Sequence, residues 1–253
     1  LLELKKIYRQ NEQFFIDLLN NVRNNALGHG DLELLNSRYK FGFQPDGEKQ
    51  YITLTTHNSK ADQINQQALA LLPEKPFTFR ADLTGDFSEK AFPVDEELVL
   101  KKGAQVMFIK NDKGEERRYF NGKLGVVEDI SAEKILVRFN TDEAPMELEK
   151  ETWRNIRYQY NKAKDSIEEE ELGTFSQFPI RLAWAITIHK SQGLTFDRAI
   201  IDAGSAFAPG QVYVALSRLT NMEGLVLRSR IGNSAVQTDA RVLEFTAMEK
   251  EVD

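Results

Sequence analysis

The chain has 253 residues and a formal net charge of −6, with 41% hydrophobic and 28% charged residues, an ordinary composition for a soluble chain of one large or two modest domains. The absence of cysteine excludes disulfides and thiolate metal sites, three scattered histidines predict no zinc site, and no apolar run is long enough for a transmembrane helix. These features favour a cytoplasmic protein, and the acidic total argues mildly against a nucleic-acid partner.

Charge is unevenly distributed along the chain. Residues 165–171 include five acids, whereas residues 181–230 include six Lys and Arg against three acids, so a local basic surface is compatible with the acidic total. The sequence starts at Leu1 in an apolar run, without an initiator Met or a signal peptide. We therefore expect it to be a fragment of a longer protein.

The first 75 residues carry the pattern of an α/β unit. Apolar residues at helical spacing predict an amphipathic helix over 11–25, and a Gly-rich break follows at 28–30. Residues 51–56 are expected to form a strand, and Asn58 or Ser59 to cap a helix that reaches Leu72. A strand, a polar turn and a helix in this order are typical of α/β proteins.

The pattern changes between Pro76 and Pro179 and changes back afterwards. Short strands are predicted there over 77–83, 104–110, 125–129, 134–139 and 153–160, with turn signals at 112–114 and 121–122. This favours a small barrel or curled sheet inserted between α/β elements. After Pro179 we expect a helix over 181–190, a strand over 199–202, a helix over 211–218, a strand over 225–227 and a final helix near 236–249.

Two polar motifs follow Pro179. The first is His189-Lys-Ser-Gln-Gly193, where Thr187, Lys190 and Ser191 would share one helix face and present donors suited to phosphate oxygens. Gly193 permits a left-handed residue or a close backbone approach. The structural alternative is a helix C-terminus at which the dipole favours Lys and Gly forms the cap.

The second motif is Gln211-Val-Tyr-Val-Ala-Leu-Ser-Arg218. It predicts a short helix with an apolar inner face, and an Arg at its end can reach a phosphate in a cleft. Alone, Arg218 is better explained as a surface residue.

Together, T-x-H-K-S-Q-G (187–193) and V-Y-V-A-L-S-R (212–218), separated by the predicted strand 199–202, resemble motifs V and VI of superfamily 1 DNA helicases. The similarity is to the RecD-like and Pif-type 5′-to-3′ branch. Residues 4–10 resemble motif IV, and residues 54–61 resemble the segment that grips single-stranded DNA. Residues 100–107 and 121–125 resemble the start of the SH3-like insertion of that family.

The resemblance implies a fold and a division of the chain. Residues 1–75 and 180–253 would form the second RecA-like domain, an α/β domain with a parallel sheet, and residues 76–179 an inserted SH3-like β-barrel. No G-x-x-x-x-G-K-[S/T] sequence occurs, and no Walker B Asp-Glu follows on a strand. The chain is therefore expected to be the C-terminal motor half of an ATP-dependent helicase and, alone, to hydrolyse no ATP.

The resemblance also implies residue roles. ATP with Mg²⁺ would bind between this half and a missing N-terminal RecA-like domain, which would hold the metal. Arg218 would be the arginine finger and Arg9 its catalytic partner, with Gln10, Gln192 and Gly193 also at the nucleotide. The residues expected to bind DNA are Thr55, Thr56, His57, Asn58, Thr187, His189, Lys190 and Ser191.

The implied partners are single-stranded DNA, duplex junctions and the N-terminal domain, with no membrane. The implied setting is DNA repair or recombination in a bacterial cytoplasm or nucleoid. Three alternatives remain open: a non-catalytic DNA- or protein-binding module derived from a helicase, a β-barrel interaction domain, and a 3′-to-5′ helicase of the same superfamily.

Overall fold

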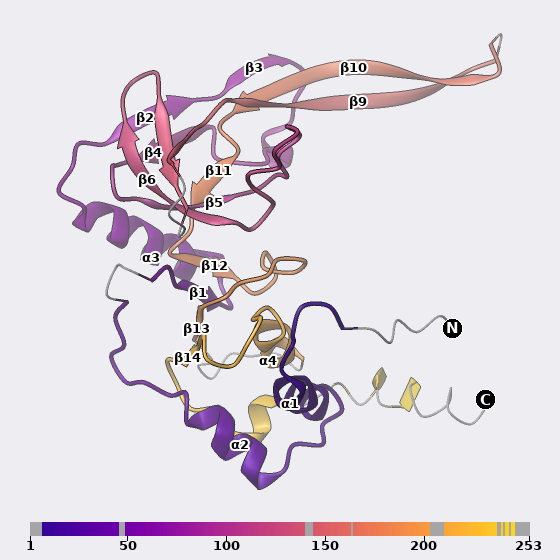
Figure 1. Ribbon diagram of the computed structural model, residues 1–253. Helices are drawn as coiled ribbons and strands as arrows, with labels where there is room; N and C mark the ends of the chain where they lie inside the picture. The colour runs from indigo at the N-terminus through magenta and orange to yellow at the C-terminus, as the bar shows by residue number, and fades with distance from the viewer. Residues whose placement is uncertain are drawn as a thin grey trace. The chain divides into compact units, whose positions relative to one another are not determined.

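The chain divides into two compact units. The computed structural model describes residues 7–45, 49–139, 144–162, 164–202, 210–236, 239, 241–242 and 244–245. One unit consists of Leu1–Gln66 and Trp184–Asp253, and the other of Gln67–Ala183 (Figure 1). Within the described residues, no helix combines the length and apolar character needed to span a bilayer.

A four-stranded parallel sheet forms the core of the first unit. Its strands lie in the order β12 (Ala185–Thr187), β1 (Ile52–Thr55), β13 (Ala199–Ile201) and β14 (Leu225–Leu227) (Figure 1). Every residue of these strands is buried, as expected for a parallel sheet covered on both faces. The strands predicted at 51–56, 199–202 and 225–227, and the α/β class with a parallel sheet, are confirmed.

Short helices complete this unit: α1 (Gln13–Arg23), α2 (His29–Asn36), most of α3 (Asn58–Leu71), α4 (Gln211–Leu216) and the 3₁₀ turn η2 (Asn233–Val236). The predicted helices over 11–25 and 211–218 and the helix ending near Leu72 are confirmed. α1 buries the apolar stripe that predicted it, and it packs against α4. The final helix expected near 236–249 lies largely outside the described residues.

Two expectations about helix boundaries need correction. The predicted break lies earlier than 28–30, because residues 24–28 separate α1 from α2, which begins at His29, and the Gly28 N–H donates to the Asp31 carboxylate at 3.0 Å. The capping expectation for α3 was also wrong, since Asn58 is already helical. His57 precedes the helix, and its N–H donates to Thr55 Oγ1 at 3.3 Å.

The helix predicted over 181–190 was wrong as well. The segment forms two strands, β11 (Ile180–Leu182) and β12, followed by a tight turn. β11 pairs antiparallel with β5 in the second unit, whereas β12 pairs parallel with β1 in the first. A short apolar run has no periodicity that separates a helix from buried strands, and here pairing with two different sheets decided the structure.

The second unit is built from antiparallel β-structure. One sheet has the order β11, β5 (Gln105–Phe108), β6 (Leu124–Ile130), β7 (Ile135–Arg138) and β8 (Met146–Glu147). Another has β3 (Asp82–Gly85), β10 (Ser166–Gln177) and β9 (Glu151–Asn161), and a third pairs β2 (Phe77–Arg80) with β4 (Glu97–Leu100). A short 3₁₀ turn, η1 (Glu89–Ala91), lies between β3 and β4.

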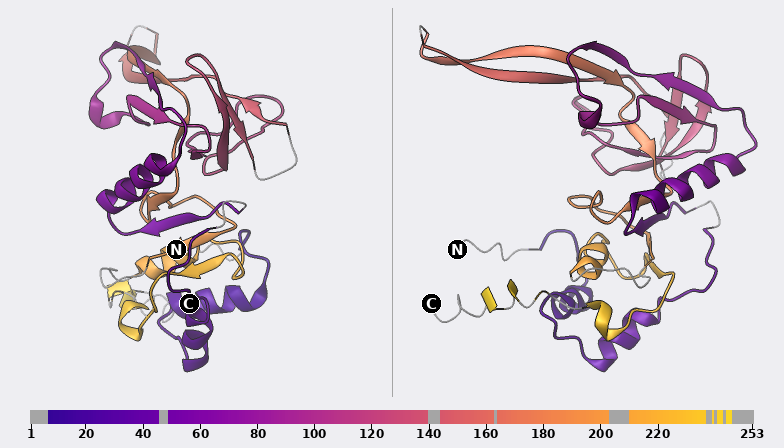
Figure 2. Two further views of the ribbon diagram at one scale, coloured as in Figure 1. Left: turned by 90° about the vertical axis from the view of Figure 1, so that its left-hand side faces the viewer. Right: turned by 180° about the vertical axis from the view of Figure 1, so that it is seen from behind.

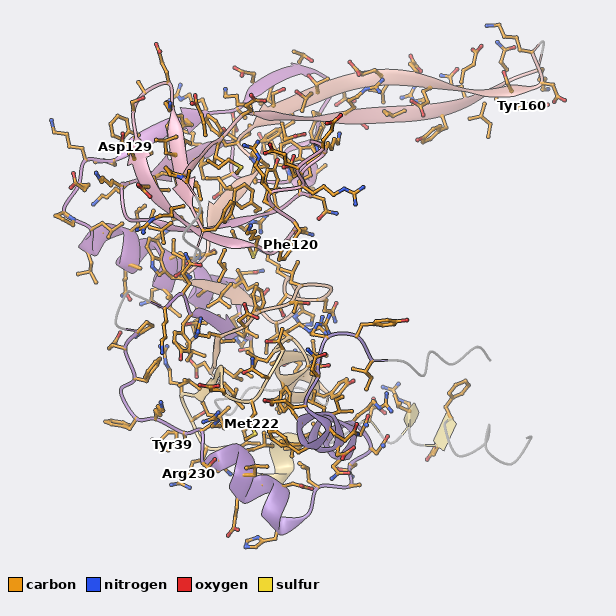
Figure 3. The ribbon with its side chains drawn as sticks, in the orientation of Figure 1. Tyr39, Phe120, Asp129, Tyr160, Met222 and Arg230 are labelled. Carbon is orange, nitrogen blue, oxygen red and sulfur yellow. The ribbon has the colours of Figure 1, made fainter. Side chains whose placement is uncertain are left out.

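The predicted strands of this unit are confirmed, with 77–83 divided between β2 and β3. Sequence patterning missed β10, which contains most of the acidic run at 165–171. β9 and β10 form a long ribbon that extends beyond the other strands of the unit (Figure 2), with Tyr160 near its end (Figure 3). Cross-strand ion pairs between Arg154 and Glu171 and between Arg157 and Glu170 offset the negative charge along this ribbon.

Gly224 allows two connections of the parallel sheet to approach each other closely. A Cβ at this position would lie 1.7 Å from the Asp197 carbonyl oxygen and 3.1 Å from the Arg198 Cα. We predict that Gly224→Ala lowers the free energy of unfolding by about 3 kcal/mol, because the backbone must move to relieve the overlap. Urea unfolding monitored by circular dichroism would measure this change in the free energy of unfolding.

The matched control is Gly30→Ala. Gly30 lies in α2, and nothing is within 4 Å of its Cβ position. Ala should there raise the unfolding free energy by roughly 0.5 kcal/mol, because Ala is the better helix former. Equal unfolding midpoints for the two variants would contradict the packing argument.

Candidate functional site

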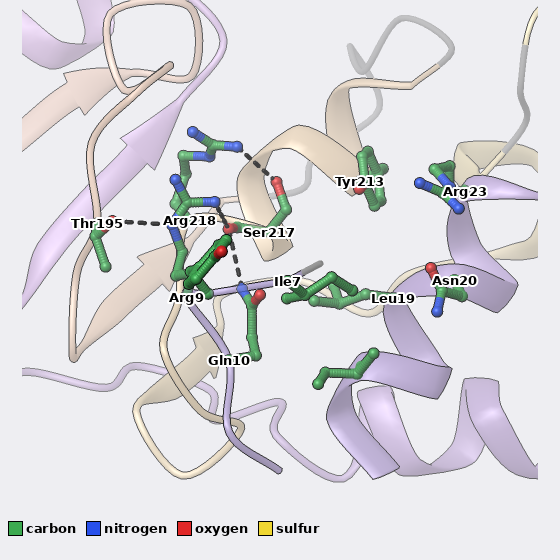
Figure 4. A pocket seen from close by; sticks show the side chains of 12 residues that line it. Ile7, Arg9, Gln10, Leu19, Asn20, Arg23, Thr195, Tyr213, Ser217 and Arg218 are labelled. Atoms are coloured by element: carbon green, nitrogen blue, oxygen red, sulfur yellow. Dashed lines mark hydrogen bonds between the residues drawn. The ribbon is translucent and has the colours of Figure 1, made fainter. Parts of the chain in front are cut away.

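A pocket of about 590 Å³ lies in the first unit, between the segment before α1, one face of α1, and α4 (Figure 4). Among the described residues that line it, three are arginines and none is a carboxylate. The lining consists of Ile7, Tyr8, Arg9, Gln10, Ile16, Leu19, Asn20, Arg23, Thr195, Tyr213, Ser217 and Arg218. A pocket with this charge balance is suited to an anionic ligand.

Arg9 enters the pocket from the segment that precedes α1. Its Nε donates to Thr195 Oγ1 at 2.9 Å and its Nη1 to the Ser217 carbonyl oxygen at 2.9 Å (Figure 4). These are its two hydrogen bonds to the described residues. An arginine carries five N–H donors, so about three remain for a ligand.

Gln10 is buried beside Arg9. Its Nε2 donates to the carbonyl oxygens of Ser217 at 3.2 Å and Leu219 at 2.7 Å. These carbonyls follow the last turn of α4, where helix geometry leaves carbonyl groups without intrahelical partners. Gln10 therefore fixes the backbone on both sides of Arg218.

Arg218 lies half-buried just after α4. Its Nε donates to the Val214 carbonyl oxygen at 3.1 Å and its Nη2 to Ser217 Oγ at 2.9 Å. Burial lowers the pKa of the Arg218 guanidinium below its ordinary value, and the positive charge of Arg9 lowers that pKa further. The guanidinium stays charged at neutral pH, so the two arginines repel each other until an anion comes between them.

A second group of predicted residues lies at the carboxyl ends of the parallel strands. Thr55 ends β1 and Thr187 ends β12, and the two are register partners. The Ile188 N–H donates to the Thr55 carbonyl oxygen at 2.9 Å, so the turn after β12 is held against the end of β1. The sheet thereby brings residues 55–58 and 187–191 together, although about 130 positions separate them in the sequence.

Exposure divides this second group. The exposed or partly exposed members are Thr56, His57, Asn58, His189 and Lys190. The buried members are Thr55, Thr187 and Ser191, whose hydroxyls bond within the protein. Thr55 Oγ1 accepts the His57 N–H, Thr187 Oγ1 accepts the Lys190 N–H at 3.3 Å, and Ser191 Oγ donates to the Ile188 carbonyl at 2.7 Å.

Residues 188–193 form a compact turn, so Thr187, Lys190 and Ser191 do not share a helix face as predicted. The Ser191 N–H donates to the carbonyls of Thr187 and Ile188. Gly193 has φ +82° and no atom within 4 Å of a Cβ position, which agrees with its expected left-handed conformation. Gln192 and Gly193 are exposed.

The segment 188–198 connects the two groups of residues. β12 and β13 are parallel, so their connection runs from the carboxyl end of one strand to the amino end of the other. Thr195 lies towards its second end, where it accepts the bond from Arg9. Sequence patterning missed Thr195, which lies outside both motifs, and gave no role to Tyr213, which lies within the second motif.

No family model matches the chain. The sequence is 34% identical over 245 residues to the ATP-dependent DNA helicase Pif1 of Bdellovibrio bacteriovorus, covering 94% of this chain and 52% of that protein. A structure of Bacteroides sp. Pif1 in complex with ADP-AlF4 matches with a TM-score of 0.87 at 36% identity, covering 97% of this chain and 56% of that one.

This chain is homologous to the Pif1-family helicases. Bacteroides Pif1 bound to ssDNA also matches, with a TM-score of 0.69 at 36% identity over 99% of this chain and 57% of that one. The chain thus spans about half the length of these Pif1 proteins. The predicted resemblance to the Pif-type branch of superfamily 1 is confirmed.

The two hydrogen bonds from Gln10 to the carbonyls of Ser217 and Leu219 give a stability prediction. Replacing Gln10 with Leu leaves the buried Leu219 carbonyl without its partner, and we expect the unfolding free energy to fall by about 2 kcal/mol. Gln13→Leu is the control, since Gln13 is exposed on α1 and bonds only the side chain of Asp17 among the described residues. That change should stay within about 0.5 kcal/mol. Chemical unfolding of both variants measures the difference. A Gln10→Leu midpoint equal to that of the control would contradict the stabilising role of the Gln10 hydrogen bonds.

Proposed function

We propose that this chain is the C-terminal motor half of an ATP-dependent DNA helicase. The observation that carries the proposal is the pocket in which Arg9 and Arg218 converge, with no carboxylate among the described lining residues. Such a pocket is suited to phosphate oxygens, and the homologous Bacteroides Pif1 was solved with ADP-AlF4. ATP is accordingly the proposed ligand.

The two arginines take complementary roles in this proposal. Arg218 is the arginine finger that stabilises negative charge on the transferring phosphoryl group, and Arg9 is its catalytic partner. Gln10 holds the backbone that carries Arg218, because its amide nitrogen already binds Ser217 and Leu219. Gln192 and Gly193 are exposed on the connecting segment and are not among the described lining residues of the pocket, and we propose that they contact the nucleotide from that segment.

We propose that the rest of the ATP site belongs to the part of the helicase outside this chain. No phosphate-binding loop sequence occurs here. The described residues contain no cluster of three or more His, Cys, Asp or Glu suited to a metal. Mg²⁺ would supply charge neutralisation of the phosphates, held by an N-terminal RecA-like domain.

Single-stranded DNA is proposed to bind at the carboxyl ends of the parallel strands. Direct contacts are assigned to the exposed members Thr56, His57, Asn58, His189 and Lys190. The buried hydroxyls of Thr55, Thr187 and Ser191 position them, because each already has a partner within the protein. The homologous Bacteroides Pif1 bound to ssDNA supports the choice of ligand.

The connecting segment gives a route from hydrolysis to movement. One end lies with the proposed DNA contacts and the other contributes Thr195 to the pocket. A change at the nucleotide can thereby alter the grip on DNA. The proposed outcome is 5′-to-3′ translocation and unwinding, measurable with 5′- and 3′-tailed duplexes.

The domain assignment follows the same proposal. The proposed second RecA-like domain is expected from the sequence at residues 1–75 and 180–253, and the compact unit that matches it consists of Leu1–Gln66 and Trp184–Asp253, because β11 pairs within the second unit. The antiparallel sheets of Gln67–Ala183 are the proposed SH3-like insertion. Duplex junctions and the N-terminal RecA-like domain are the proposed partners, and DNA repair or recombination in the bacterial cytoplasm or nucleoid is the proposed setting.

The arginine finger can be tested in the full-length protein. Arg218→Ala should lower the ATPase kcat by about a thousandfold, because the charge that stabilises the transferring phosphoryl group is lost. Steady-state ATPase and fluorescence anisotropy with oligo-dT measure turnover and DNA affinity. Arg80→Ala, an exposed arginine of the second unit paired with Glu97, is the control and should match the wild type. Parallel loss of DNA binding in Arg218→Ala would contradict the assignment.

Lys190 provides the corresponding test for DNA. Lys190→Ala should weaken oligo-dT binding and reduce the salt slope of log K by about 0.7, since one phosphate contact is lost. Lys134→Ala removes an exposed lysine paired with Glu147 in the second unit and should leave the slope unchanged. Titrations at several salt concentrations measure both, and an unchanged slope for Lys190→Ala would remove it from the DNA site.

A further inference from the structure

We propose that Thr195 is a positioning residue for the arginine pair, holding the Arg9 guanidinium in the orientation that meets the phosphates. The inference rests on the proposed function of the pocket and adds to it a residue that no motif singled out. The proposal is based on the hydrogen bond that Arg9 Nε donates to Thr195 Oγ1 within the pocket, at 2.9 Å.

The two bonds of Arg9 fix its planar group. The Nε bond to Thr195 holds the inner edge of the guanidinium, and the Nη1 bond to the Ser217 carbonyl holds one outer nitrogen. Both Nη2 hydrogens and one Nη1 hydrogen then remain for a ligand. Without the Thr195 hydroxyl, the guanidinium can rotate about the single remaining anchor and present a different edge.

The backbone around Thr195 is tied to that of Arg218. The Phe196 N–H donates to the Arg218 carbonyl at 2.9 Å, and the Thr220 N–H donates to the Phe196 carbonyl at 3.1 Å. Phe196 and Leu219 form an isolated bridge at the same place. The Thr195 hydroxyl therefore holds Arg9 against the same backbone segment that bonds the Arg218 carbonyl. This fixes the relative positions of two positive charges that repel each other.

Thr195 is also close in sequence to the turn after β12. The Leu194 N–H donates to the Ser191 carbonyl at 3.0 Å, and Leu194 and Ser191 are both buried. A shift of this turn moves the hydroxyl that orients Arg9. The nucleotide pocket is thereby mechanically connected to the proposed DNA contacts at His189 and Lys190.

The test uses the full-length helicase and three substitutions. Thr195→Val keeps the shape but removes the hydroxyl, and it should lower the ssDNA-stimulated ATPase kcat on the order of tenfold while oligo-dT affinity stays at the wild-type value. Thr195→Ser keeps the hydroxyl and should return kcat to within about twofold of wild type. Arg9→Ala should lower kcat by at least as much as Thr195→Val.

A double-mutant cycle separates positioning from general damage. If Thr195 acts through Arg9, adding Thr195→Val to Arg9→Ala should change kcat by less than about twofold. Independent, multiplying losses would overturn the inference, as would a Thr195→Ser enzyme as slow as Thr195→Val. A wild-type kcat for Thr195→Val beside a slow Arg9→Ala overturns the inference but leaves the proposed function standing. A wild-type kcat for Arg9→Ala would instead overturn the arginine assignment itself.

Discussion

The constraint on which the site depends is the parallel pairing of β12, β1 and β13. Because β12 and β13 both run parallel to β1, which lies between them, the connection from β12 to β13 must run from the carboxyl ends of the strands to their amino ends. Eleven residues, 188–198, make that crossing without a helix. The same short segment therefore contributes exposed polar side chains at one end and the Thr195 hydroxyl at the other.

The charges that line the pocket matter more for anion binding than the net charge of the chain. The protein carries a net charge of −6, yet the part of the pocket lining that the structure describes has three arginines and no carboxylate. Part of the acidic surplus lies on the β9–β10 ribbon, where Arg154 and Arg157 pair with Glu171 and Glu170. Electrostatic attraction at short range depends on the groups that face a ligand, so an acidic total does not argue against an anion site.

The end of α4 is held by side chains from the segment before α1. α4 has six residues, and Gln10 and Arg9 both donate to carbonyls that follow it. These bonds satisfy carbonyl groups that a short helix leaves unpaired, and they also fix the backbone on both sides of Arg218. The Gln10 bonds hold backbone groups, whereas the Thr195 hydroxyl holds a side chain, so unfolding reports on Gln10 and turnover reports on Thr195.

The sequence by itself determined the elements with strong periodicity or strong boundaries. The α1 stripe, the strands β1, β13 and β14, and the ordered pair of motifs around residues 187–193 and 212–218 were all predicted. Only the tertiary structure decided the 181–190 segment, because a short apolar run becomes helix or strand according to the sheets it meets. Tertiary packing also buried Ser191 and joined Arg9 to Thr195, 186 positions apart in the sequence. Local patterns cannot contain such pairings, since they exist only once distant segments are packed together.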